Sequence, residues 1–186
     1  MIELPNEVVL IRDFVNTAEP QVGRDEWTSP AAAQNWLSAH ALLVGADPDA
    51  QFRPADLRRL RVLREGLRDI LHGHAGHDVD PAAVDALNQE LAAVQLRMSF
   101  GATGPPVLTA ASRRPYDVAV TGLLATVQDA VVNRTWERLK ACSRDTCRWA
   151  FYDGSRNRSA RWCSMSGCGN IVKMRRAHAR ASNAGD

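Results

Sequence analysis

The chain of 186 residues contains four cysteines, and all of them lie in its last quarter. They form two pairs of equal spacing, with four residues between the members of each pair and fifteen between the pairs. Four thiolates can fill the tetrahedral shell of one zinc ion, which leaves no open position for catalysis. The spacing therefore predicts one structural zinc ion per chain, bound by Cys142, Cys147, Cys163 and Cys168.

Two disulfides are the alternative use of these cysteines. The first residues, MIELPNEVVLIRD, include two glutamates and no basic leader, so we expect no signal peptide and a cytoplasmic location. A reducing cytosol disfavours structural disulfides and favours metal binding by clustered thiols. No apolar run approaches the roughly 18 residues of a membrane helix, so no membrane partner is expected.

The elements that must position the cysteines are mainly helical. Apolar residues recur every three or four positions, and this spacing predicts helices over 5–17, 30–43, from 54 to about 73, from 81 onward, and 116–140. The stretches 94–100 and 106–112 flank a turn that contains glycine and proline, and they predict a small β-hairpin. We expect a helical domain over residues 1–140, whose last helix leads directly to the first cysteine pair.

Residues 141–186 are expected to form a separate metal-dependent module. The aromatic stretch 148–152 predicts a strand, 153–159 has turn composition, and a helix is expected over 170–181. A knuckle, a hairpin and a helix describe a treble-clef-like finger, with a zinc ribbon as the alternative. So short a module buries little apolar area, which explains its need for a metal.

The charge of the chain is unevenly distributed. Residues 141–180 carry nine basic and two acidic residues, a net charge of +7, whereas the remainder carries −5. A basic module favours a polyanionic partner, for which we expect DNA, although the two parts could instead dock on each other. The residues expected to contact nucleic acid are Arg156, Arg158, Arg161, Lys173, Arg175, Arg176 and Arg180. On the last helix we expect Ile171 and Met174 to face the zinc core instead.

Polar residues outside the finger offer two further candidate sites. Asp13, Asn16 and Thr17 could line a ligand pocket, or they could satisfy backbone groups where the first helix ends. His72, His74 and His77 could bind a second metal, or they could form a polar helix end beside glycines. No catalytic triad, phosphate-binding glycine loop or carboxylate pair is evident, so an enzyme is not expected.

Two parts of the sequence resemble known families. The stretch from Cys142 to Asn170, with Phe151-Tyr-Asp-x-Ser155-Arg-Asn157 and Trp162-Cys-Ser-Met165, resembles the CGNR-type zinc finger. The segment Asp13-Phe-Val-Asn-Thr17 and the helices after it are similar to the ABATE domain that precedes this finger. The resemblance covers nearly the whole chain and implies a stress-linked bacterial transcription regulator. One position departs from the motif, because Ile171 replaces the arginine of its name and so removes whatever contact that arginine makes.

These observations predict a DNA-binding regulator in which the finger meets phosphates and the helical domain senses a small-molecule effector or forms a homodimer. One alternative is a protein-interaction adaptor, in which zinc only shapes a docking surface for a protein partner. The other is a ligand-binding or enzymatic helical domain with an accessory finger.

Overall fold

The computed structural model describes residues 4–183, except for the side chains of Arg176 and of residues 179–183. The chain is mainly α-helical, as the sequence predicts. Its helices are α1 (Asn6–Asn16), α2 (Pro30–Ala39), α3 (Pro54–His74), α4 (Pro81–Ala92), α5 (Pro115–Val132) and α6 (Asn170–Asn183). The described strands form three short antiparallel pairs: β1 (Ala18–Glu19) with β2 (Arg24–Asp25), β3 (Leu96–Ser99) with β4 (Val107–Ala110), and β5 (Leu139–Ala141) with β6 (Ala150–Tyr152).

Capping residues fix where two of the helices begin. The hydroxyl of Ser29 accepts a hydrogen bond from the backbone of Ala32 at 3.1 Å, and Pro30 follows at the first helical position. Asp80 caps α4 in the same way, with Pro81 next in the chain. Both arrangements satisfy a backbone N–H group that the first turn leaves unpaired. The predicted starts of α2 and α4 are therefore confirmed.

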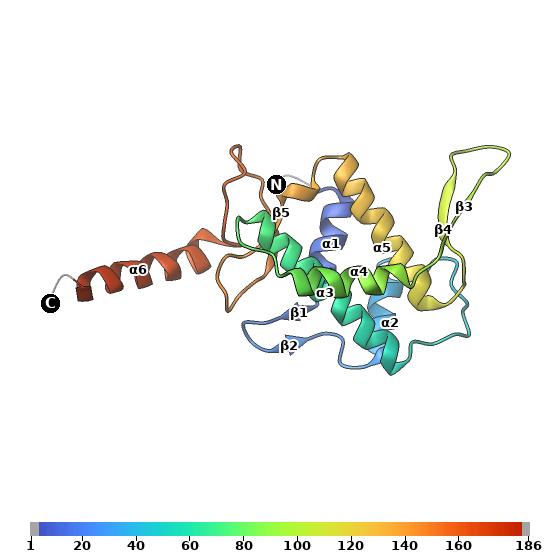
Figure 1. Cartoon of the computed structure of the whole chain (residues 1–186), viewed down its shortest axis with the longest axis horizontal. Coiled ribbons are helices and arrows are strands. Elements are labelled where there is room, and N and C mark those ends of the chain that lie inside the picture. Colours follow the sequence, from blue (N-terminus) through green and yellow to red (C-terminus); the bar gives the residue numbers. More distant parts are fainter. Residues whose placement is uncertain (1–3, 184–186) are drawn as a thin grey trace.

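The core of the molecule is built around α1, which packs against α3 and α5 (Figure 1). Phe14 of α1 meets the rings of Trp27 and Trp36 edge-on, with centroid separations of 5.2 and 5.9 Å. The same apolar cluster continues into the β5–β6 pair through Leu139 and Ala150, both fully buried. The strands near the first cysteine pair thus share their core with the helices.

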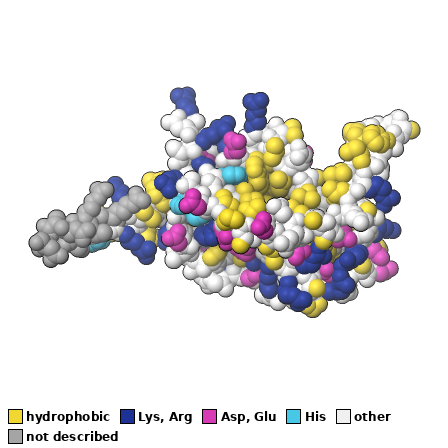
Figure 2. All heavy atoms as spheres, viewed as in Figure 1, with side chains coloured by type: hydrophobic (Ala, Val, Ile, Leu, Met, Phe, Trp, Pro, Cys, Tyr) yellow, Lys and Arg dark blue, Asp and Glu magenta, His cyan; other side chains and the backbone are white. Residues whose placement is uncertain are grey.

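Two elements extend from opposite ends of this body (Figure 1). The β3–β4 hairpin, which the sequence predicts, exposes Met98, Phe100 and Val107, and Figure 2 shows hydrophobic side chains over it. Helix α6 extends away at the other end, and its contacts with the rest of the chain are mainly to the turn just before it. None of the described helices is long and apolar enough to cross a membrane.

Two helices end earlier than the sequence predicts. Helix α5 stops at Val132 rather than near 140, because Arg134 adopts a left-handed φ of 58° and the backbone N–H of Thr135 returns to Ala130 at 2.9 Å. Helix α2 stops before 43 in the same way at Ala41, whose φ is 57°. This closing motif usually carries glycine, so neither stop is marked in the sequence.

Candidate metal centre and its junction with the helical body

The first cysteine pair lies on the turn that joins β5 to β6. Cys142 directly follows β5, and its backbone N–H donates to the carbonyl of Trp149 at 2.9 Å, which closes the turn. The N–H of Cys147 donates to the carbonyl of Arg144 at 2.7 Å. Arg148 then reverses the chain with a φ of 48°. The backbone therefore fixes both thiols of this pair on one short loop.

The second pair sits where α6 begins. A five-residue π-turn, Met165–Gly169, carries Cys168, and Cys163 stands just before it. The hydroxyl of Ser164 accepts from the N–H of Gly167 at 3.1 Å and so caps this turn. A β-carbon on Gly169 would lie 3.0 Å from the sulfur of Met165, so the tight packing favours glycine there.

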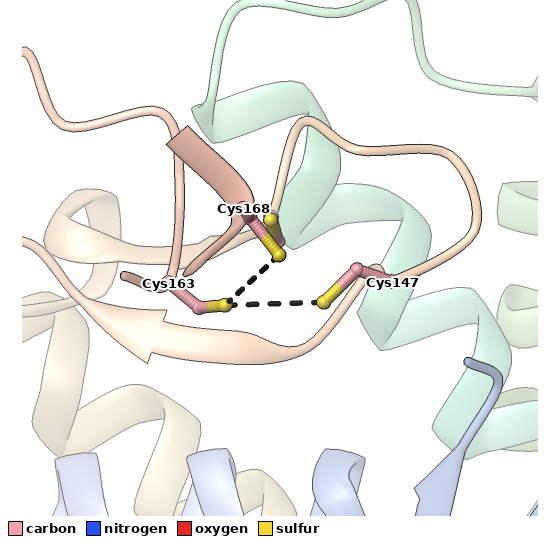
Figure 3. A group of neighbouring side chains, drawn as sticks. Cys147, Cys163 and Cys168 are labelled. Atoms are coloured by element: carbon pink, nitrogen blue, oxygen red, sulfur yellow. Dashed lines mark hydrogen bonds between the residues drawn. The ribbon is translucent and has the colours of Figure 1, made fainter. Parts of the chain in front are cut away.

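The four sulfur atoms converge on one point, all within 4.8 Å of one another. The sulfur of Cys163 lies 3.8 Å from that of Cys147 and 3.8 Å from that of Cys168, and the three side chains point toward one another (Figure 3). A tetrahedron with zinc–sulfur bonds of about 2.3 Å has edges of about 3.8 Å. Disulfide sulfurs would be about 2 Å apart, and all four cysteines are free thiols.

The thiols also have the electrostatics of a cation site. The hydrogen bond from Cys147 lowers the pKa of Cys142 to about 5, and the same bond raises the pKa of Cys147. Burial, followed by the nearby charge of Cys142, raises the pKa of Cys163 to about 12. One thiolate thus opposes ionisation of its neighbours, whereas a divalent cation would favour four thiolates. The donor set and spacing fit one structural zinc ion per chain.

Polar side chains of the body hold strand β6 against the helices. The side-chain amide of Asn16 donates to the carbonyl of Ala150 at 2.9 Å and accepts from its N–H at 2.8 Å. Arg68 of α3, only 2% exposed, donates to the carbonyl of Arg148 at 2.9 Å and to that of Val15. The guanidinium of Arg148 pairs with Asp69 at 2.6 Å. The finger is therefore tied to α1 and α3 through its own backbone and through the side chain of Arg148.

A buried ion pair holds the loop that follows β6. The ammonium of Lys140 lies 2.7 Å from the carboxylate of Asp153, and both residues are at most 5% exposed. Lys140 also donates to the carbonyls of Arg158 and Ala160, so its three N–H groups all have acceptors. Asp153 accepts in turn from the backbone of Ser155 at 3.0 Å. The pair thereby fixes residues 153–160 as a structured loop.

The basic residues expected to bind nucleic acid differ in their surroundings. Arg156, Lys173 and Arg175 are exposed and form no ion pair with the described residues, while Arg158 lies 3.3 Å from the carboxylate of Glu137. Arg161 is exposed and approaches the ring of His77. The side chains of Arg176 and Arg180 lie outside the described residues. Figure 2 shows basic side chains projecting from the end of the molecule that carries helix α6.

The apolar side of α6 does not pack on the zinc core as the sequence suggests. Ile171 is 37% exposed and Met174 is 56% exposed, because the helix leaves the body after its first turn. Ile171 lines a hollow of about 330 Å³ together with Cys168 and Arg144. The residue in place of the motif arginine is therefore beside the metal site and accessible.

The three residues proposed for a ligand pocket are separated by the structure. Asp13 and Asn16 line an open cleft of about 680 Å³ between α1 and β6, whose other wall includes Phe151. The amide of Asn16 is already engaged with β6, as described above. Thr17 is buried elsewhere, where its hydroxyl donates to the carbonyl of Phe14 at 2.8 Å. Whether the cleft binds a ligand stays a prediction.

The histidines do not converge as ligands. The rings of His72 and His77 stack at 4.0 Å, and His74 donates to the carbonyl of Leu139 at 2.8 Å. Burial, with help from Arg148 and His77, lowers the pKa of His72 to about 4, so this ring is neutral at physiological pH. The four cysteines form the one metal-binding group found in the described part of the chain. The histidines instead lie at the junction of body and finger.

The fold and the site together define a zinc-finger protein in which a helical body precedes and supports the finger. Comparison with family sequence models agrees with this class. The CGNR zinc finger matches residues 138–181, and the ABATE family, described as "Putative stress-induced transcription regulator", matches residues 9–136. The second match covers more than half of the chain, so the protein belongs to the ABATE family. No curated protein matches the sequence.

Proposed function

We propose that this protein is a DNA-binding transcription regulator whose zinc finger presents cationic residues to the phosphate backbone. The family description supports a regulator rather than an enzyme. The observation that carries the proposal is the loop of residues 153–160, which the buried Lys140–Asp153 pair holds and which exposes Arg156 and Arg158. Guanidinium groups suit phosphates because they donate in a fixed planar fork.

The loop is organised before any partner arrives. The metal site fixes the residues on either side of it, and the Lys140–Asp153 pair holds its interior, so the backbone of the loop loses little freedom on binding. Lys173 and Arg175 of α6 offer further cationic groups on a projecting helix. Ile171 supplies no such group, so the remaining residues must bind without the motif arginine. Contacts of this kind position a protein on DNA without reading its sequence.

Salt dependence of DNA affinity tests this proposal. The zinc-loaded chain is titrated with labelled duplexes, and fluorescence anisotropy is recorded at several salt concentrations. We expect the affinity for DNA to fall steeply with salt concentration. The double variant Arg156→Gln/Arg158→Gln should reduce the slope of log affinity against log salt concentration by about 0.9 for each phosphate that it no longer neutralises. The control Arg24→Gln/Arg58→Gln removes the same charge from exposed positions of the helical part. Absent or salt-independent binding contradicts the proposal, and a protein partner without DNA affinity would favour the adaptor.

The helical body is proposed to sense a small effector. The cleft between α1 and β6 supports this role, because its volume of about 680 Å³ suits a metabolite and its walls come from both the body and the finger. A ligand in that position touches the strand that leads into the DNA-facing loop. Thermal stabilisation of the zinc-loaded chain by added metabolites tests the role, and an unresponsive melting temperature opposes it.

A further inference from the structure

The cleft between α1 and β6 contains a cation that the described residues hold in place but do not neutralise. Arg138 lines the cleft, and its guanidinium donates to the carbonyls of Asp153 at 2.9 Å and Ser155 at 3.1 Å. Carbonyl groups orient a guanidinium but leave its positive charge in place. Within residues 4–183, no carboxylate forms an ion pair with Arg138. The cleft therefore presents a fixed positive charge to whatever enters it.

An aromatic surface lies in the same cleft. Phe151, Trp149 and Tyr152 all line it, and Phe151 is half-buried yet lies outside both apolar clusters of the described chain. Trp149 packs on the cysteine cluster and Tyr152 on the main core, so these two rings already have partners. The ring of Phe151 thus offers an apolar face for a planar group.

The wall formed by α1 adds a hydrogen-bond acceptor. The carboxylate of Asp13 pairs with Arg12 at 2.7 Å and remains 35% exposed. This pairing neutralises Arg12, so among the described residues that line the cleft Arg138 is the cation without a carboxylate partner. A carboxylate has several acceptor sites, so Asp13 can still accept a hydrogen bond from a ligand N–H or O–H group.

We infer that this cleft binds a small aromatic carboxylate. Its carboxylate pairs with Arg138, its ring lies on Phe151, and a ring N–H or O–H donates to Asp13. One unpaired guanidinium matches the single charge of a monocarboxylate, whereas a phosphate monoester carries a charge of about −1.5 to −2 and would be only partly neutralised. The inference rests on the sensor role proposed above and specifies its ligand class.

Such a ligand would also couple the two parts of the protein. It would contact α1 and β6 at once, beside the two hydrogen bonds between Asn16 and Ala150. The bound acid would therefore stabilise docking of the finger on the body. Arg138 links this effect to the DNA-facing loop, because the carbonyls that hold its guanidinium belong to Asp153 and Ser155.

Matched acids and amides test the inference in the absence of DNA. Isothermal titration of the zinc-loaded full chain uses indole-3-acetate and 4-hydroxyphenylacetate, each compared with its neutral amide. We expect both acids to bind and each amide to bind about tenfold more weakly or worse, as expected for loss of a charge-assisted hydrogen bond. Arg138→Gln should weaken the acids to the level of the amides and leave the amides unchanged. Phe151→Leu should weaken acids and amides alike.

Controls separate loss of the site from loss of the fold and from failure of the DNA proposal. Arg58→Gln removes an exposed charge on α3 and should leave acid binding unchanged, and zinc content and melting temperature verify each variant. The inference is overturned if neither acid binds at millimolar concentration, or if acids and amides bind equally. It is also overturned if Arg138→Gln weakens DNA binding alone, which would assign the cleft to nucleic acid. Acid binding by a chain that ignores DNA would leave this inference intact and reject only the DNA proposal.

Discussion

Replacing Asp153 by asparagine should destabilise the protein far more than an ordinary polar substitution. The change removes the partner carboxylate of Lys140, which is 5% exposed and would keep its charge among carbonyl groups alone. Breaking a buried pair from one side costs about 3–5 kcal/mol. Burial by itself would raise the pKa of Asp153, yet hydrogen bonds from Lys140 and Ser155 outweigh it and lower the pKa to about 2. Relative to the usual 3.8, this shift corresponds to about 2.5 kcal/mol, somewhat below that range because it omits the cost of leaving Lys140 buried without its partner.

Urea unfolding at neutral pH with saturating zinc measures the loss for Asp153→Asn. The control Ser155→Ala removes one hydroxyl bond to the same carboxylate, 2.6 Å long, together with the 3.2 Å bond that this hydroxyl accepts from the N–H of Ser159, and should cost about 1.5 kcal/mol at this exposed position. Because the folded-state pKa is lowered, the stabilisation is complete above the unfolded value of 3.8 and is lost as pH falls toward 2. The advantage of wild type over Asp153→Asn should therefore shrink in acid. A neutral-pH loss no larger than that of Ser155→Ala would refute the reasoning.

Three further substitutions test the metal site, the junction and the body. Cys168→Ser should abolish stoichiometric zinc in elemental analysis, and full zinc retention would oppose the four-thiolate site. Asn16→Ala breaks both hydrogen bonds to Ala150 and should lower the free energy of unfolding by about 2 kcal/mol. The control Asn133→Ala removes an exposed hydrogen bond to Glu7 and should change this free energy little. Equal effects of the two variants would contradict a stabilising role for the junction. Gly66→Ala places a β-carbon 2.8 Å from that of Leu87 and should lower the melting temperature. The control Gly154→Ala meets open space and should leave the melting temperature unchanged. An unchanged melting temperature for Gly66→Ala would contradict the tight α3–α4 contact.

Features with a local chemical signature could be predicted from the sequence. The cysteine spacing predicts the convergent thiols, since the two short loops leave each pair few arrangements. Pro30 and Pro81, each after a capping side chain, mark helix starts that the structure reproduces. The ends of α2 and α5 could not be predicted, because Ala41 and Arg134 adopt conformations that favour glycine. Missing the stop at Arg134 also hid strand β5, which the apolar spacing assigns to the preceding helix.

The junction could not be predicted because its partners are far apart in the chain. Asn16 and Ala150 are separated by 134 positions, and Arg68 and Arg148 by 80. The only local signal is the placement of Arg64 and Arg68 one helical turn apart beside the apolar stripe of α3, where both are buried. An arginine beside such a stripe normally extends to solvent. Only the fold shows that Arg68 instead reaches backbone carbonyls of the finger.

Strand β6 is the element through which all of these features act. Ala150 at its start is held by Asn16, Arg148 two residues earlier is held by Arg68, and Cys147 before that belongs to the metal site. Phe151 lines the cleft, and Asp153 begins the loop that exposes the arginines. Because one short segment joins the body, the metal and the loop, loss of zinc should disturb the body's docking as well as the finger. In the regulator proposed above, an effector in the cleft would act on the loop of residues 153–160 through the same segment.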